Sequence, residues 1–149
     1  MAIEILGTTV IDDSKNIQNV GIVSSSGNPF TLYRPILSDY SEKINNIGNT
    51  NSSCNIDLSL GNYVIATLNQ STTFSFSAGT TTGISGFALQ LTNGSGGPFT
   101  ITWPASIRWS AESIPARTTD DGKTDIWSFI TTDGGTTWLG NLSSVAFAL

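Results

Sequence analysis

Residues 125–140, which read DIWSFITTDGGTTWLG, contain the strongest fold signal in the chain. Residues 126–130 are rich in β-branched and aromatic side chains, a composition that is typical of a strand. Asp133 and the two glycines after it are typical of a tight turn, and a second apolar run starts at Trp138. The stretch therefore predicts a β-hairpin.

The turn matches the Asp-box pattern S/T-x-D-x-G-x-T-W over residues 131–138. In this pattern the aspartate side chain accepts hydrogen bonds from turn N–H groups, the glycine takes a positive φ, and the tryptophan enters the core. The motif is familiar from sialidases and other propellers, which need several copies, whereas this chain has one. We therefore interpret Asp133, Gly135, Thr137 and Trp138 as a structural hairpin and predict that the protein is not an enzyme.

Short apolar and Ser/Thr runs separated by turn residues extend back from this hairpin to about residue 51. They predict about seven to nine strands at spacings of roughly 8–12 residues, and no segment has a convincing helical period. This spacing favours an all-β fold, an antiparallel β-sandwich or a jelly-roll-like barrel, over residues 51–149.

Residues 1–50 have a different texture, because their small apolar residues are scattered among Asp, Asn, Ser and Gly without a sustained period. We interpret them as an extended N-terminal arm with short β pieces. The arm has apolar residues to bury but no evident partner within itself, so we predict that it lies along another subunit. A terminal strand docked on its own sheet is the alternative. The predicted interface residues are Ile3, Ile5, Val10, Ile11, Ile17, Val20 and Ile22.

The composition restricts the classes of function that are open to this chain. Charged residues make up 11% of the 149 residues, against about 25% in typical domains, and the net charge is −5. A charge-poor surface suits a large symmetric interface, although a β-protein with a Ser/Thr surface explains it equally well. The acidic balance argues against a nucleic-acid partner. With no apolar run of about 18 residues and no apolar leader at the start, we predict neither a membrane span nor a signal peptide.

Few residues are candidates for chemistry. The chain has no histidine, and its one cysteine, Cys54, is expected to be a small buried hydrophobe. The carboxylates near the end of the chain do not fit a calcium loop or single out a catalytic pair, so they are interpreted as solvated turns. These carboxylates are Asp120, Asp121, Asp125 and Asp133. We predict no catalytic, cofactor-binding or metal-binding residue and no cofactor.

The four tryptophans are Trp103, Trp109, Trp127 and Trp138. Because large aromatic residues usually pack in cores, core packing is the first interpretation. Trp109 lies between Arg108 and Ser110 and is the best candidate for an exposed sugar-binding ring.

Several phrases of the chain resemble a known family. They are GFALQLT at 86–92, FTITWPASIRW at 99–109, DIWSF at 125–129 and TDGGTTWLG at 132–140. Their order resembles a small β-domain of virion proteins from tailed phages, especially cyanophages and marine phages, over roughly residues 55–142. Residues 7–20 are similar, more weakly, to a short segment of fibre and decoration proteins.

The resemblance implies a non-enzymatic virion protein, often trimeric, made in the host cytoplasm and carried on the outside of the particle. A short arm followed by one β-domain favours a capsid decoration (cement) protein that binds the major capsid protein as a trimer. A short tail-fibre, knob or tail-tip domain that binds host glycan is the alternative. Outside this family, a carbohydrate-binding module that uses Trp109 and a glycan-cleaving enzyme are the competing hypotheses.

Overall fold

The computed structural model describes residues 3–5, 8–11, 41–79 and 83–149. The chain divides into two compact units, Met1–Asp39 and Tyr40–Leu149, which we describe separately. In the first unit, β1 (Ile3–Ile5) and β2 (Thr8–Ile11) form an antiparallel pair in which Ile3 lies opposite Ile11. These two short strands of the predicted arm therefore pair with each other.

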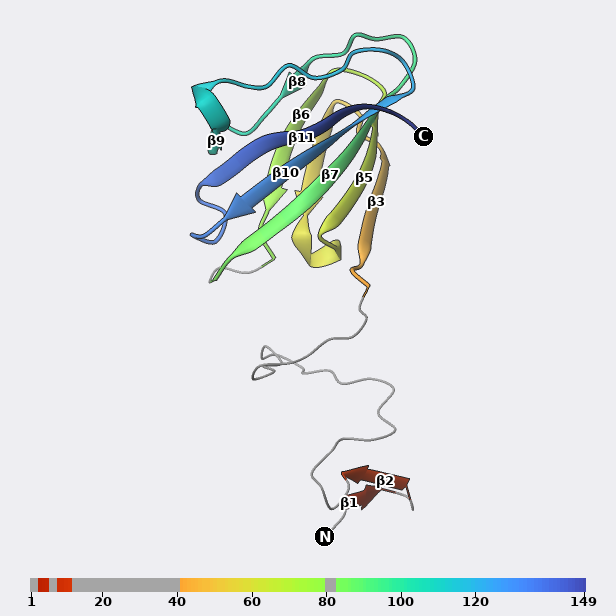
Figure 1. The fold of residues 1–149 in the computed structure, drawn as a ribbon, viewed down its shortest axis with the longest axis vertical. Helices are drawn as coiled ribbons and strands as arrows, with labels where there is room; N and C mark the ends of the chain where they lie inside the picture. Colours follow the sequence, from red (N-terminus) through yellow and green to blue (C-terminus); the bar gives the residue numbers. More distant parts are fainter. Residues whose placement is uncertain (1–2, 6–7, 12–40, 80–82) are drawn as a thin grey trace. The chain divides into compact units, whose positions relative to one another are not determined.

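The second unit contains two sheets, one of six strands and one of three (Figure 1). The larger sheet has the order β3-β5-β7-β10-β11-β9, and the smaller has the order β4-β6-β8. The strand bounds are β3 Ile44–Asn49, β4 Ser53–Asp57, β5 Tyr63–Leu68, β6 Thr72–Ser77, β7 Ser85–Asn93, β8 Ile101–Thr102, β9 Ile107–Trp109, β10 Lys123–Thr131 and β11 Trp138–Ala148. Short 3₁₀ turns span Leu58–Leu60 and Ser110–Glu112.

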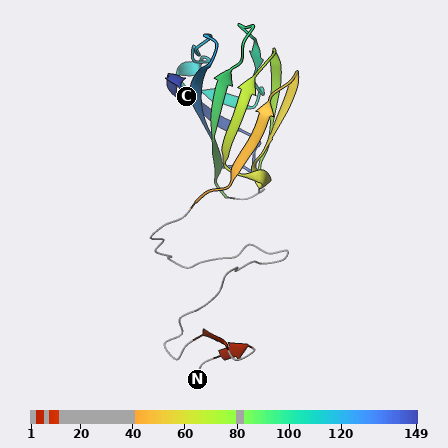
Figure 2. The same cartoon turned by 90° about the vertical axis from the view of Figure 1, so that its right-hand side faces the viewer.

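Strands β3 to β8 form a parallel coil, because the chain crosses from one sheet to the other with each successive strand. In the larger sheet β3, β5 and β7 are parallel neighbours, and in the smaller sheet β4, β6 and β8 are parallel neighbours. Figure 2 shows β3, β5 and β7 side by side with their arrows pointing the same way. The first two strands of the coil, β3 and β4, are edge strands of the two sheets.

Strands β10 and β11 form the hairpin predicted from the sequence, and β10 pairs antiparallel with β7. The all-β prediction is confirmed, but the pairing is mixed and not antiparallel throughout. Parallel strands need a long crossover connection. Here each crossover is a strand of the other sheet and not a helix. The sequence therefore has no helical segment that would have indicated parallel pairing.

The β-domain begins earlier than predicted. Strand β3 pairs with β5, with Ile44 opposite Tyr63, so it belongs to the larger sheet and not to an arm over residues 1–50. The strand escaped the sequence prediction because a polar residue, Asn45, takes a buried position in it. The Asn45 side chain satisfies this position by donating a hydrogen bond to the backbone oxygen of Asp57 at 3.2 Å.

The core lies between the two sheets and is strongly aromatic. Phe76 reaches in from the smaller sheet, and its ring centroid lies 4.9 Å from that of Phe129 and 5.0 Å from that of Phe87. Trp127 and Trp138 of the hairpin are fully buried, as core packing predicted. Edge-to-face contacts of this kind add to the free energy gained from burial. The core therefore holds the hairpin against the coil.

Candidate functional site

The turn between β10 and β11 has the hydrogen bonds of the motif from which it was predicted. Asp133 Oδ1 accepts a hydrogen bond from the Thr137 backbone N–H at 2.9 Å. Gly134 and Gly135 have φ values of 68° and 91°, which favour glycine. Trp138 follows directly and is buried. The Thr137 N–H, followed by the Thr131 hydroxyl, holds the pKa of the Asp133 carboxyl below its usual range.

Thr131 is a member of this turn that the sequence interpretation did not single out. Its buried hydroxyl donates to Asp133 Oδ1 at 2.8 Å and accepts from the Gly135 N–H at 3.0 Å. The Asp-box pattern has Ser or Thr at its first position, and this could have identified Thr131 from the sequence. These hydrogen bonds supply acceptors for the backbone N–H groups of the turn. The Asp133 carboxylate therefore has a structural role in the turn.

Asp125 was predicted to be part of a solvated acidic group, but the structure buries it with only 2% of its surface exposed. Its Oδ2 accepts from the Thr118 N–H at 2.8 Å and its Oδ1 accepts from the Ala146 N–H at 3.0 Å. Because a buried carboxylate needs hydrogen-bond donors, both oxygens are satisfied by backbone amides. Through these two hydrogen bonds, Asp125 joins the loop before β10 and the end of β11 to β10 itself.

Arg117 lies close to this carboxylate and completes a polar network. Its Nη1 donates to Asn93 Oδ1 at 2.6 Å and to the Thr118 carbonyl at 2.8 Å, and its Nη2 donates to the Phe99 carbonyl. Burial lowers the pKa of Arg117, and the charge of Asp125 opposes that shift. The network is structural, because its donors and acceptors bond to each other and to backbone groups.

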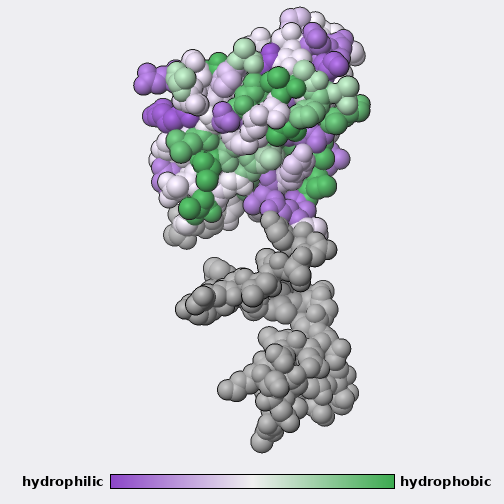
Figure 3. Space-filling view, viewed as in Figure 1, coloured by the Kyte–Doolittle hydropathy of each residue, from purple (hydrophilic) through white to green (hydrophobic). Residues whose placement is uncertain are grey.

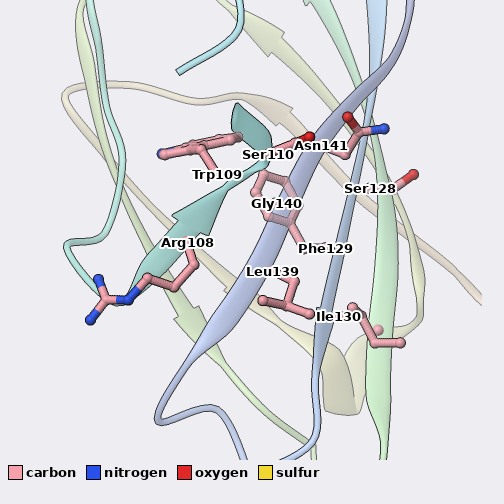
Figure 4. A pocket seen from close by; sticks show the side chains of 10 residues that line it. Arg108, Trp109, Ser110, Ser128, Phe129, Ile130, Leu139, Gly140 and Asn141 are labelled. Carbon is pink, nitrogen blue, oxygen red and sulfur yellow. The ribbon is translucent and has the colours of Figure 1, made fainter. Parts of the chain in front are cut away.

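A groove of about 800 Å³ lies where β9, β10, β11 and β7 meet (Figure 4). Figure 4 shows Leu139 and Ile130 side by side, with the guanidinium of Arg108 turned away from them. The residues that line it are Gly86, Arg108, Trp109, Ser110, Ser128, Phe129, Ile130, Leu139, Gly140 and Asn141. Most of these are apolar or uncharged, so the groove suits an apolar or neutral ligand surface.

Trp109 borders this groove but is only partly available as a sugar platform. Its ring is half-buried and packs edge-to-face against Trp103 and Trp127, with centroids 5.7 Å away in both cases. Gly140 permits this packing, because a Cβ there would lie 2.9 Å from the Trp109 ring and 2.8 Å from Ile107. Trp109 therefore has a core role as well as a place on the groove.

The outward side of the larger sheet is a broader candidate surface that includes part of this groove. Alternation along each strand sends one set of side chains into the core and the other set outward. The outward set, which we call the outer face, consists of Ile44, Asn46, Tyr63, Ile65, Thr67, Gly86, Ala88, Gln90, Thr92, Thr124, Ile126, Ser128, Ile130, Leu139, Asn141 and Ser143. None of these side chains carries a charge at neutral pH, but Arg108 of β9 lies on the same side beside them, in register with Leu139, and is exposed.

The structure places the predicted interface residues in two groups. Ile3 and Ile5 lie on β1, and Val10 and Ile11 lie on β2. Ile17, Val20 and Ile22 fall outside the described residues.

Chemical groups outside these surfaces are few. Cys54 is buried as expected, and this burial raises the pKa of its thiol to about 11. In residues 41–79 and 83–149, no three His, Cys, Asp or Glu side chains gather as metal ligands would. The part of the chain that the structure describes also contains no helix long and apolar enough to cross a membrane. Comparison with protein-family models, curated proteins and solved structures found no match to the chain.

Proposed function

We propose that this chain is a structural virion protein of a tailed bacteriophage, a non-enzymatic capsid decoration protein that binds the outside of the particle as a trimer. The partner is the major capsid protein, and the attached trimers stabilise the capsid. The resemblance over residues 55–142 suggests this class, and the geometry of the β-domain supports it in two ways.

The observation that carries the proposal is the charge-poor outer face of the larger sheet, beside which Arg108 is the one charged side chain among the outward residues of its strands. Charged residues are depleted at the cores of protein interfaces, and exposed apolar side chains mark such surfaces. Here Leu139 and Ile44 are 56% and 55% exposed on a face that has few charges. The acidic side chains Asp125 and Asp133, meanwhile, are engaged in structural hydrogen bonds. This combination favours assembly over catalysis.

The N-terminal arm supplies the attachment in this proposal. Ile3, Ile5, Val10, Ile11, Ile17, Val20 and Ile22 contact the capsid or a neighbouring subunit by adding strand-like segments to exposed sheet edges. Because β1 and β2 already pair with each other, only their outer edges are free for that addition. Backbone hydrogen bonds provide the affinity and alternate side chains provide the direction.

Two measurements test the proposal. Purified protein mixed with stripped capsids is expected to co-sediment with them, and quantitative mass spectrometry of intact virions is expected to give a copy number comparable with that of the major capsid protein. A copy number of only a few chains per particle would place the protein in the tail and overturn the decoration function.

A truncation tests the arm. The chain without residues 1–24 is expected to keep the folded β-domain, which begins at Tyr40, and to bind stripped capsids more weakly than the full chain. Circular dichroism checks the fold and sedimentation checks the binding. Wild-type affinity of the truncated chain would show that the arm does not attach the protein, and loss of the fold would show that the arm is part of the core.

The groove beside Trp109 favours a second candidate function, a tail-fibre or tail-tip domain that binds host surface glycan. A sugar ring stacks on an aromatic face and needs polar groups beside it, which Arg108 and Asn141 can provide. Glycan-array binding that is lost in Arg108→Ala and Asn141→Ala would support this function. These variants are preferable to Trp109→Ala, because that change also removes core packing.

A further inference from the structure

The groove beside Trp109 is lined by two rows of residues that cross the strands of the larger sheet. The first row runs in register from β7 to β9 through Gly86, Ile130, Leu139 and Arg108. The second row, two residues away on β10 and β11, contains Ser128 and Asn141, which lie opposite each other. Both rows line the groove, so it draws its residues from four strands whose register is fixed by the fold.

The groove is hollow because small residues alternate in it with large ones. Gly86 has no side chain, and Ser110 and Ser128 have short ones, whereas Ile130 and Leu139 are 41% and 56% exposed beside them. Figure 3 shows a hydrophobic area where, in Figure 1, the tip of β10 and the start of β11 lie. The volume of about 800 Å³ lies in the range of small-molecule sites, about 300–1,000 Å³. A hydrocarbon that covers these side chains gains free energy when both leave water.

The exposed apolar wall of the groove is aliphatic. Trp109 borders the groove, but its ring is half-buried because it packs against Trp103 and Trp127. The large apolar side chains that remain exposed in the lining are Ile130 and Leu139. An aliphatic wall lacks the flat ring face on which a sugar stacks, and it makes dispersion contacts along the side of a hydrocarbon chain. This wall therefore favours a hydrocarbon over a sugar ring.

Arg108 adds a cation at the end of the first row and is the one ionisable residue among those that line the groove. It is exposed, and its Nη1 makes a long hydrogen bond of 3.5 Å to the Ala105 carbonyl. Glu112 borders a neighbouring hollow together with Arg108 but does not line the groove itself. Figure 4 shows the guanidinium turned away from Ile130 and Leu139, so the cation and the apolar wall are separate. A guanidinium is a planar fork of N–H donors that a carboxylate matches with two parallel hydrogen bonds.

We propose that the groove binds a small amphipathic carboxylate, a fatty acid, with its hydrocarbon chain along Ile130 and Leu139 and its carboxylate on Arg108. The two parts of this ligand are separated in the same way as the apolar wall and the cation. The chain carries a net charge of −5, so an anion is recognised by contact with Arg108 and not by attraction over a distance. The site is independent of attachment to a capsid, which uses the arm.

Isothermal titration calorimetry of the purified full-length chain tests the ligand with three probes. Decanoate, kept below its micelle concentration, is expected to bind. Decanol has the same chain length without the charge and is expected to bind about fivefold more weakly, the effect of losing an exposed ion pair. Galacturonate has a carboxylate without a hydrocarbon chain and is expected to bind at least about a hundredfold more weakly, because no methylene groups are buried.

Matched variants test the two walls of the site. Arg108→Gln should weaken decanoate binding about fivefold and leave decanol binding unchanged, while Arg108→Lys keeps the charge and should lose less. Leu139→Gln should weaken both probes about fivefold. The controls are Lys43→Gln, which removes an exposed cation directly before β3, and Leu60→Gln, in the 3₁₀ turn before β5, where the leucine is 48% exposed. Both controls should bind decanoate like the wild type, and thermal melting of each variant verifies folding.

Several results would overturn the inference. Wild type that does not bind decanoate would remove the site, and galacturonate binding as tight as that of decanoate would assign the groove to an acidic sugar. Equal losses in Arg108→Gln and Lys43→Gln would show a general effect of charge, and wild-type affinity of Leu139→Gln would place the ligand elsewhere. Sedimentation with phosphatidylglycerol vesicles without binding of decanoate would assign the surface to a membrane. Failure to bind capsids would count against the decoration function and leave this inference standing.

Discussion

The parallel coil from β3 to β8 and the antiparallel hairpin of β10 and β11 hold their registers by different means. In the hairpin, one turn fixes the pairing, and Asp133, Thr131 and Thr137 lie within a few residues of one another. In the coil, side chains form hydrogen bonds with residues 18–22 positions away, across neighbouring strands and turns. The pair of buried hydroxyls on Thr50 and Thr72, 2.7 Å apart, is the clearest example.

This difference shows how one chain combines local and distant sources of order. A local turn forms its hydrogen bonds at a small cost in chain entropy, whereas each coil must first close a loop of about twenty residues. We therefore expect stability to depend more on the side chains that join the coils, or join the hairpin to the coil, than on the turn. The predictions below test this ranking from the largest expected effect to the smallest.

The junction of the two regions includes a polar network in which Asp125, on β10 opposite Leu91 of β7, lies near Arg117, and Arg117 donates to Asn93 of β7. Asp125→Ala removes the acceptor for two backbone N–H groups and leaves Arg117 without its nearby carboxylate. We expect a loss of roughly 2–5 kcal/mol in the free energy of unfolding, measured by urea denaturation. Asp125→Asn keeps one acceptor oxygen and should lose less. Equal stability of Asp125→Ala and wild type would show that the junction is held by apolar packing alone.

The coil itself is tested at Thr72, which is 2% exposed. Its hydroxyl meets that of Thr50 and donates to the Asn51 carbonyl at 2.6 Å. Thr72→Val keeps the shape and leaves these partners unsatisfied, so the free energy of unfolding should fall by about 1–3 kcal/mol. Thr73→Val on the exposed side of the same strand is the control and should change stability by no more than about 0.5 kcal/mol. Similar losses in both variants would point to a strand effect unrelated to the buried pair.

The turn of the hairpin is tested by Asp133→Ala. The change removes the acceptor for the Thr137 N–H and the partner of the Thr131 hydroxyl. Because water can reach this turn, we expect only a small decrease in Tm, measured by calorimetry, and a smaller one than for Thr72→Val. Asp120→Ala, in the turn before β10, is the control for charge removal. A decrease larger than that of Asp125→Ala would reverse the ranking of the two regions.

Acid should remove the contribution of the Asp133 carboxylate in the hairpin turn and that of the Asp57 carboxylate at the end of β4 in the coil. The pKa of Asp133 and that of Asp57 are both lowered from their ordinary value of 3.8 by hydrogen bonds to the carboxylates. The stabilisation is thus complete above the unfolded pKa and is lost as the pH falls through the lower folded pKa. The difference in Tm between wild type and Asp133→Ala should be constant from pH 7 to about pH 5 and shrink below about pH 4. If the Tm difference persisted at lower pH, the ionised Asp133 carboxylate would be excluded as the source of the stabilisation.

The sequence predicted the hairpin and the all-β class because their signals are local. The Asp-box residues lie next to one another, and a period of two identifies strands wherever they pair. It did not predict the parallel partner of β3, since nothing near Ile44 indicates Tyr63. The burial of Asp125 was also missed, because its donors at Thr118 and Ala146 come together only through the tertiary fold. Trp109 was expected to be the exposed tryptophan, and packing against Trp103 and Trp127 leaves it half-buried.

The order of strand directions across the larger sheet has a mechanical consequence. Strands β3, β5 and β7 run one way, β10 runs the other way, and β11 again runs with the first three. The domain is therefore entered at the start of β3 and left at the end of β11, at opposite ends of strands that point in the same direction (Figure 1). Tension between Tyr40 and Leu149 then loads the ladders in shear, so that many hydrogen bonds resist together and do not open one after another as in a zipper.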